Sequence, residues 1–225
     1  MAERIEEERK GLADSVGGFL TRYRVLFIGG IVALIVVAVA WGILSSVSTA
    51  SHRKGLNQLE GIVYTLSKAE EDSIEAARET ALSQILDLAA GNKGNIVGLR
   101  ANMAAAEIYF SQKQWAEAKD CWLAAATVET DAYTAPLCYY NAAVCAEELA
   151  DVEGAIACYE SALASDSCDF KTHVLFSLGR LHEEGGDFAA ASESYMELRN
   201  SYPSDSWTDL AESRLIALRA EGRIQ

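Results

Sequence analysis

Hydrophobic positions divide the chain into one long uncharged run and a series of amphipathic segments after it. The run, at residues 25–47, reads VLFIGGIVALIVVAVAWGILSSV and holds no charged residue. At about 1.5 Å per residue, a helix of this length crosses the roughly 30 Å hydrocarbon core of a bilayer. The pattern therefore predicts a single transmembrane helix at 25–47, preceded by an arm at 1–24.

A cleaved signal peptide is the rival interpretation of this run, because Ser48-Thr49-Ala50 resembles a small-x-small cleavage site. The apolar core of a signal peptide is only about 7–15 residues long, which is shorter than this run. We therefore expect the run to stay as an anchor, and a mature protein that begins near Ser51 would contradict this.

Small residues four positions apart lie within the run, and such spacing allows two membrane helices to approach closely. Ordinary membrane-helix composition also explains them. The candidates for helix packing are Gly29, Ala33, Ala38 and Gly42.

After the run, apolar residues recur with helical spacing. The residues of the first i, i+3, i+4 pattern are Leu56, Leu59, Ile62, Val63 and Leu66. After an acidic break, the second stripe consists of Ala77, Ala81, Ile85, Leu88 and Ala89. We expect a degenerate first helix pair at 51–97, ended by a segment rich in Gly and Asn.

A repeat of helix pairs follows, with units at 99–130, 136–167 and 172–203. The units align with spacings of 37 and then 36 residues. Small residues let two helices approach closely, and an aromatic residue one turn later fills the space to the next pair. The aligned small residues are Ala118, Ala155 and Ala191, and the aligned aromatic residues are Trp122, Tyr159 and Tyr195.

This motif resembles the tetratricopeptide repeat. The third unit carries it in Leu178, Gly179, Ala191, Tyr195 and Pro203, but the other two units lack the final proline. The resemblance implies an all-α chain, in which the membrane helix is followed by a tetratricopeptide-repeat α-solenoid at 98–225.

A final helix is expected to cover the last repeat, because the terminal unit of a solenoid needs a cap. Ser204 or Ser206 is the expected N-cap. The residues expected to cover the apolar edge of the repeat are Trp207, Leu210, Leu215 and Leu218.

The first helix of each repeat is expected to line a peptide-binding groove, as the resemblance implies. Aromatic and apolar side chains with a few charges suit an extended or helical peptide. Internal packing of the same aromatic residues is the alternative. The groove candidates are Arg100, Met103, Glu107, Phe110, Leu137, Tyr140, Val144, Glu147, His173, Phe176, Arg180 and Glu183.

Charge restricts the partners and favours one orientation. The net charge is −14, and all of it follows the arm, which holds equal numbers of acidic and basic residues. A nucleic-acid partner is therefore not expected, because phosphate binding needs a basic surface. The basic residues of the arm modestly favour a cytoplasmic N-terminus and a periplasmic or extracytoplasmic C-terminal domain.

Catalytic chemistry is not indicated. The three histidines, at 52, 173 and 182, have no nucleophile–base pattern around them. The five cysteines show no CxxC spacing, so neither a metal site nor a cofactor is expected; most cysteines are expected to be buried thiols, although disulfides stay possible.

The architecture as a whole resembles the YfgM-like family of ancillary subunits of the bacterial SecYEG translocon. That resemblance implies a scaffold in the inner membrane, with translocon subunits and a membrane-anchored periplasmic chaperone as partners and exported proteins as clients. A scaffold for cell-wall or outer-membrane assembly is the alternative. An enzyme or a signalling receptor is a third hypothesis, which no motif supports.

Overall fold

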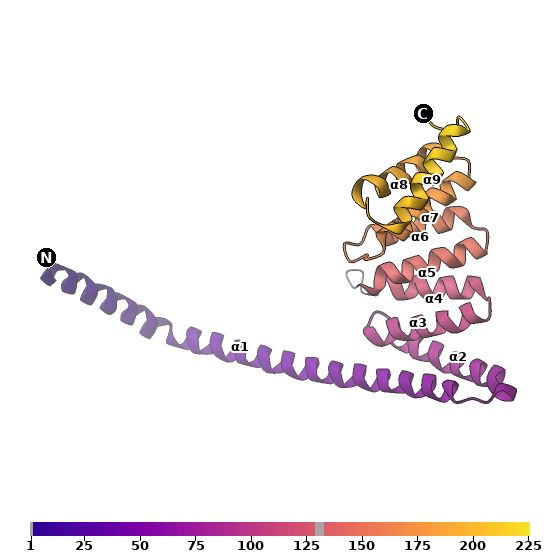
Figure 1. Cartoon of the computed structure of the whole chain (residues 1–225). Helices are drawn as coiled ribbons and strands as arrows, with labels where there is room; N and C mark the ends of the chain where they lie inside the picture. Colours follow the sequence, from indigo (N-terminus) through magenta and orange to yellow (C-terminus); the bar gives the residue numbers. More distant parts are fainter. Residues whose placement is uncertain (1, 129–132) are drawn as a thin grey trace. The chain divides into compact units, whose positions relative to one another are not determined.

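A computed structural model describes the backbone of residues 2–128 and 133–225, and side chains from Tyr23 onward except residues 24, 25, 27, 31 and 129–132. The described residues form helices joined by short turns (Figure 1). Contacts divide the chain into two units, residues 1–53 and 54–225. The elements are α1 Ala2–Ser67, the 3₁₀ turn η1 Glu71–Ser73, α2 Ile74–Gly91, α3 Ile96–Ser111, α4 Trp115–Ala126, α5 Thr134–Glu148, α6 Val152–Leu163, α7 Lys171–Glu184, α8 Phe188–Ser201 and α9 Ser206–Ala220.

Helix α1 contains the segment that is long and apolar enough to cross a membrane. That segment runs from Ile28 to Ser67, and its most apolar window has no buried residue. Helical backbone continues through residues 48–50, where Thr49 donates its hydroxyl proton to the carbonyl of Ser45 at 2.9 Å. The four small packing candidates of the run are exposed, so their role in helix association stays a prediction.

In the second unit, each helix from α2 to α9 packs against the next (Figure 1). The aligned small residues Ala118, Ala155 and Ala191 are fully buried, as are Ala106 and Ala143 on the preceding helices. At Gly179 an added Cβ would lie 2.3 Å from the Tyr195 ring. The third pair therefore needs glycine where the other two accommodate alanine.

The turns within the pairs repeat the same backbone conformation. Lys113, Ala150 and Gly186 occupy the equivalent position and all have positive φ. The next residue is the N-cap, and both Asp151 and Asp187 accept a backbone N–H of the following helix at 3.0 and 3.1 Å. Lys113, Ala150 and Gly186 lie 37 and 36 positions apart, which are the spacings of the aligned small residues, so the turns follow the period of the repeats.

The expected first pair packs onto the repeats. Ala81, Ile85 and Leu88 of α2 are buried, and so is Leu59 near the end of α1. An added Cβ at Gly55 would come within 2.7 Å of Val97, so α1 approaches the start of α3 closely there. Residues 54–67 of α1 therefore act as the first helix of this pair.

The expected cap of α9 was wrong. Asp205, rather than Ser204 or Ser206, accepts the backbone N–H of Trp207 at 2.9 Å. A carboxylate also interacts more favourably with a helix N-terminus than a hydroxyl does, because it opposes the positive end of the helix dipole.

The expected apolar face of α9 was only partly right. Leu215 and Leu218 are buried, and Trp207 is half-buried, but Leu210 is 49% exposed. Helix α9 packs on α7 and α8, and no further helix covers the side that carries Leu210 among the described residues.

Candidate functional site

The twelve groove candidates form four rows that recur on α3, α5 and α7; we call this surface the first-helix face. None of the twelve is buried: Arg100, Glu107, Phe110 and Leu137 are exposed and the others are half-buried. Helix α9 continues three rows with Trp207, Leu210 and Arg214, at a spacing of 34 residues. The rows are 100/137/173/207, 103/140/176/210, 107/144/180/214 and 110/147/183.

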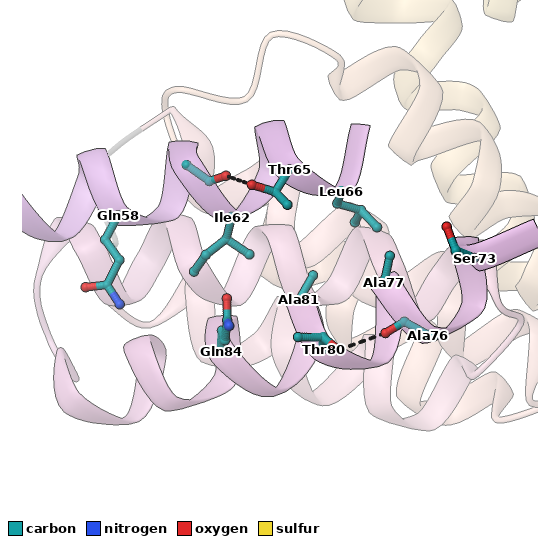
Figure 2. Close-up of a pocket in the computed structure, with 11 residues that line it drawn as sticks. Gln58, Ile62, Thr65, Leu66, Ser73, Ala76, Ala77, Thr80, Ala81 and Gln84 are labelled. Atoms are coloured by element: carbon teal, nitrogen blue, oxygen red, sulfur yellow. Dashed lines mark hydrogen bonds between the residues drawn. The ribbon is translucent and has the colours of Figure 1, made fainter. Parts of the chain in front are cut away.

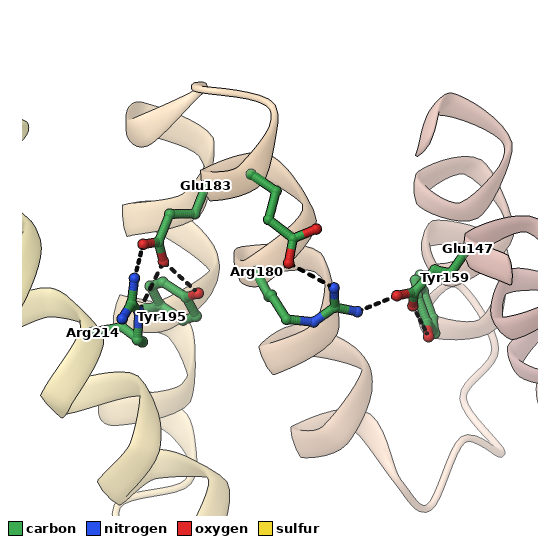
Figure 3. A network of polar contacts seen from close by, with 7 residues as sticks. Glu147, Tyr159, Arg180, Glu183, Tyr195 and Arg214 are labelled. Atoms are coloured by element: carbon green, nitrogen blue, oxygen red, sulfur yellow. Dashed lines mark hydrogen bonds and ion pairs between the residues drawn. The ribbon is translucent and has the colours of Figure 1, made fainter. Parts of the chain in front are cut away.

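A polar contact joins the second repeat to the third. Tyr159 of α6 donates its hydroxyl proton to Glu147 of α5 at 2.7 Å, and Arg180 of α7 forms an ion pair with that carboxylate (Figure 3). Arg180 also binds Glu184 at 3.0 Å. Burial, and then the adjacent Glu147 carboxylate, raise the pKa of Tyr159, which keeps the hydroxyl protonated as a donor.

The same contact joins the third repeat to α9. Tyr195 donates to Glu183 at 3.1 Å, and the guanidinium of Arg214 binds both oxygens of Glu183, with one contact at 3.1 Å (Figure 3). The hydrogen bonds from Arg214 lower the pKa of Glu183. Each junction therefore contains a Tyr, a Glu and an Arg; we call this arrangement the Tyr–Glu–Arg ladder.

Aromatic rings make a second set of contacts across the face. The ring centroid of His173 lies 5.2 Å from Tyr140 of α5 and 4.1 Å from Trp207 of α9, where the rings stack. Phe176 lies 5.1 Å from the same Trp207. Burial lowers the pKa of His173, so the ring is held neutral between its neighbours. The aromatic candidates of α5 and α7 thus pack against neighbouring helices while keeping part of their surface exposed.

The first repeat lacks the ladder. Phe110 occupies the position of Glu147, Val144 that of Arg180, and Trp122 that of Tyr159. Phe110 packs edge-to-face on Trp115 at 4.8 Å, and the buried Nε1 of Trp122 has no hydrogen-bond partner among the described residues. At the ladder positions this junction is therefore apolar, and an indole N–H takes the place where the other repeats place a bonded hydroxyl. Its polar contact lies elsewhere, where Lys119 of α4 binds Asp151 at the start of α6 at 2.9 Å.

Two grooves border the end of α1. The larger, of about 690 Å³, lies between α1 and α2 and is lined mostly by small and polar residues, with Ile62 and Leu66 as its largest apolar side chains (Figure 2). The smaller, of about 520 Å³, lies between α1 and α3. It brings Arg100, Met103 and Glu107 together with residues of α1 that the sequence did not assign to the face.

The structure adds four residues to the site; the sequence analysis had used three of them only for the fold and had not named Arg214. Tyr159, Tyr195, Trp207 and Arg214 all contact the face. A signal was present, because each Tyr follows its Glu by twelve positions in both repeats. The partner Arg comes from the following element, so its pairing depended on how successive repeats stack.

The five cysteines are buried and free. Burial raises the pKa of Cys121 and Cys145 to about 11 and that of Cys138 to about 12. Such thiols are unreactive near neutral pH, since the thiolate is the nucleophile. In the part of the chain that the structure describes, no group of three or more His, Cys, Asp and Glu residues is placed to hold a metal ion.

Comparison with known proteins identifies the repeats. The tetratricopeptide-repeat profile matches residues 137–167 and 173–205, which are the second and third units expected from the sequence. The chain is 27% identical over 247 aligned residues to a protein named TPR repeat-containing protein from Treponema pallidum (strain Nichols), and the alignment covers 97% of this chain and 98% of that one.

A solved structure titled "Crystal structure of MamA" is also similar, with 14% identity and a TM-score of 0.48, covering 66% of this chain and 81% of its own. The two profile matches, together with the helices of the described residues, show a helical fold with tetratricopeptide repeats, which typically supports protein–protein interaction without catalysis.

Proposed function

We propose that this tetratricopeptide-repeat chain is a non-enzymatic scaffold, anchored in a membrane, that binds protein segments on its first-helix face. The supporting observation is that all twelve side chains of this face keep accessible surface while their helices are held firmly by a buried core. Partly exposed rings beside fixed charges provide apolar contact together with polar specificity, which is what peptide recognition requires.

The anchor in this proposal is the uncharged run at 25–47. The absence of buried residues in its most apolar window supports contact with lipid rather than with a protein core. With the N-terminus in the cytoplasm and the anchor in the inner membrane, the repeats lie in the periplasm. The net charge of −14 disfavours binding of the repeats to anionic headgroups.

The partners in this proposal are translocon subunits and a membrane-anchored periplasmic chaperone, and the clients are exported proteins. The support is the resemblance in architecture to YfgM-like subunits. The same face recurs on three successive repeats, so it suits a long client segment. Such a segment can extend along the rows and contact the first helix of each repeat in turn.

Photo-crosslinking in cells tests the binding face. We would place a photoreactive amino acid at Phe110 or Leu137 on the face, and at Ala124 or Ala157 on exposed positions of the second helices as matched controls. Adducts to translocon subunits from the face positions alone are expected. Equal adducts from the control positions would contradict the proposal, and adducts to cell-wall synthases would favour the envelope-assembly scaffold.

Protease protection tests the anchor and its orientation. A protease added after the outer membrane is permeabilised should remove the repeats and leave the arm intact. Cleavage of the arm alone would reverse the orientation, and a mature chain that begins near Ser51 would show that the run is a signal peptide.

A further inference from the structure

The groove between α1 and α3 differs chemically from the rest of the first-helix face. Its apolar lining includes Val63, which is 43% exposed, Tyr64, which is 64% exposed, and Met103. These side chains are close to one another and accessible to solvent. Large apolar side chains grouped in an open groove are a typical feature of a binding surface.

The charged residues of this groove lack partners. Glu60, Arg100 and Glu107 line it, and none of them forms an ion pair or a side-chain hydrogen bond within the described residues. In the same row, α5 has the apolar Val144, whereas Arg180 of α7 and Arg214 of α9 are each bound by a Glu of the preceding first helix. The face is therefore satisfied internally at its C-terminal end and unsatisfied at its N-terminal end.

The Tyr–Glu–Arg ladder, which the first repeat lacks, does not form between α1 and α3 either. Helix α1 ends at Ser67, and the residue 37 positions before Phe110 is Ser73, which lies beyond that end in η1. The residues of α1 that line the groove with Glu107 carry no positive charge; they are Leu59, Glu60, Val63, Tyr64 and Ser67. In addition, position 107 is a carboxylate where α7 and α9 have a guanidinium.

The negative charge of the groove and of the chain favours a positively charged partner. Two carboxylates and one guanidinium line the groove, and the chain as a whole carries a net charge of −14, all of it after the arm. A second copy of the chain would bring the same negative field and be repelled. A segment with basic side chains would be attracted and would supply the cations that Glu60 and Glu107 lack.

We propose that the groove between residues 54–67 of α1 and α3 binds a protein segment that carries basic residues next to apolar ones, with the basic groups at Glu60 and Glu107. This rests on the proposed function and names the chemistry of the partner. The apolar residues of the segment contact Val63, Tyr64 and Met103.

Peptide binding to the full chain tests this proposal. The chain is placed in nanodiscs of zwitterionic phosphatidylcholine, which removes lipid charge as a source of attraction. The probe is a fluorescent twelve-residue peptide of Leu and Ser with two Arg, and the comparison probe has Glu in place of both Arg. Fluorescence anisotropy gives the dissociation constants, and nanodiscs without protein give the background.

Two double variants with equal charge change locate the site. Glu60→Lys with Glu107→Lys reverses the groove, and Glu160→Lys with Glu193→Lys reverses two exposed, unpartnered carboxylates of α6 and α8. We expect binding of the Arg peptide to weaken at least tenfold for the groove variant and at most about threefold for the control. A third variant, Val63→Ser with Tyr64→Ser, should weaken binding about fivefold without a change of charge.

Several outcomes would overturn the proposal. Equal affinity for the Arg and Glu peptides would refute a basic occupant, as would the absence of binding. Equal losses of affinity for the two charge variants would show that the Arg peptide is attracted by the overall charge of the chain and not by the groove. A change of oligomeric state in the groove variant without a change in peptide affinity would identify a second copy as the occupant.

Failure of the groove proposal can be distinguished from failure of the proposed function. Crosslinks from Leu137 in cells would persist if the face binds proteins elsewhere and only the groove assignment is wrong.

Discussion

Arg180 on α7 forms an ion pair with Glu147 on α5, so that a side chain of the third repeat is bound to the second. The two residues are 33 positions apart, and the Arg214–Glu183 pair repeats the relationship 31 positions apart. The ladder therefore adds polar contacts between successive repeats to the contacts of the buried core.

The Arg180–Glu147 pair should stabilise the junction measurably. We expect a double-mutant cycle of Arg180→Gln and Glu147→Gln to give a coupling free energy of about 1 kcal/mol, since both side chains are only partly exposed and the carboxylate also accepts from Tyr159. Chemical denaturation of the full chain in mild detergent, followed by tryptophan fluorescence, measures it. The exposed Arg78–Glu75 pair on α2 serves as a control, with a coupling of about 0.3 kcal/mol.

At the first junction, the Glu and the Tyr of the ladder should stabilise the fold only when both are introduced together. Phe110→Glu and Trp122→Tyr each remove apolar contact, and each should lower the free energy of unfolding by about 1–2 kcal/mol. Together they recreate the Glu–Tyr pair of the other repeats, so the double variant should be about 1 kcal/mol more stable than the sum of the two losses predicts. Strict additivity in thermal melts would show that the ladder does not transfer.

Gly179 should tolerate no Cβ. Gly179→Ala places a methyl group 2.3 Å from the ring of Tyr195, and the shift required should cost about 1–3 kcal/mol. We expect Tm to fall by several degrees. Gly61→Ala in α1 is the matched control, because nothing lies within 4 Å of its added Cβ; its Tm should stay the same or rise. A similar fall in both variants would contradict this explanation.

Ala150 should be better replaced by glycine. Its φ of 56° is costly for a residue with a side chain, and the third repeat has Gly186 at this position. Ala150→Gly should therefore stabilise the fold by about 0.5–1 kcal/mol and raise Tm by about 2 °C. Ala157→Gly, within α6, should have the opposite sign by about 1 kcal/mol. A loss of stability at position 150 would refute the argument.

The Glu183–Arg214 pair should make stability depend on pH in a specific direction. The pKa of Glu183 is lowered from 4.5 in the folded chain, chiefly by hydrogen bonds from Arg214. Its contribution is therefore fully present above the pKa of the unfolded chain and is lost as pH falls through the lower folded value. The difference in Tm between the parent chain and Glu183→Gln should be largest at pH 7 and shrink toward pH 3.

The exposed Glu193 provides the comparison for this pH dependence. Glu193→Gln removes an exposed carboxylate of α8 that has no partner within the described residues, so its effect on Tm should be small at every pH. A difference for Glu183→Gln that stays constant down to pH 3 would show that its carboxylate gains nothing from Arg214.

Much of the fold was predictable from local pattern. The alignment of Ala118, Ala155 and Ala191 located the tight helix contacts. The first residues of α4, α6 and α8, which are Trp115, Val152 and Phe188, keep the same spacings of 37 and 36 residues. Helix caps were less predictable, since Ser204 or Ser206 was expected as the N-cap of α9 and the N-cap is Asp205. Several residue types fulfil that role equally well, and only the backbone decides which of three neighbours is the N-cap.

By itself, the sequence determined the uncharged run, the helical class and the period of the repeats; the choice of the first helices for the candidate face came from the resemblance to the tetratricopeptide repeat. Each of these depends on residues close together in the chain, and helical spacing translates them directly into a surface. Only the tertiary structure decided which side chains on that face are bound to one another. Arg180 and Glu147 are 33 residues apart, and within the described residues Glu107 has no ion-pair partner because the α1 residues beside it carry no positive charge. Both facts follow from how one helix pair is stacked on the next.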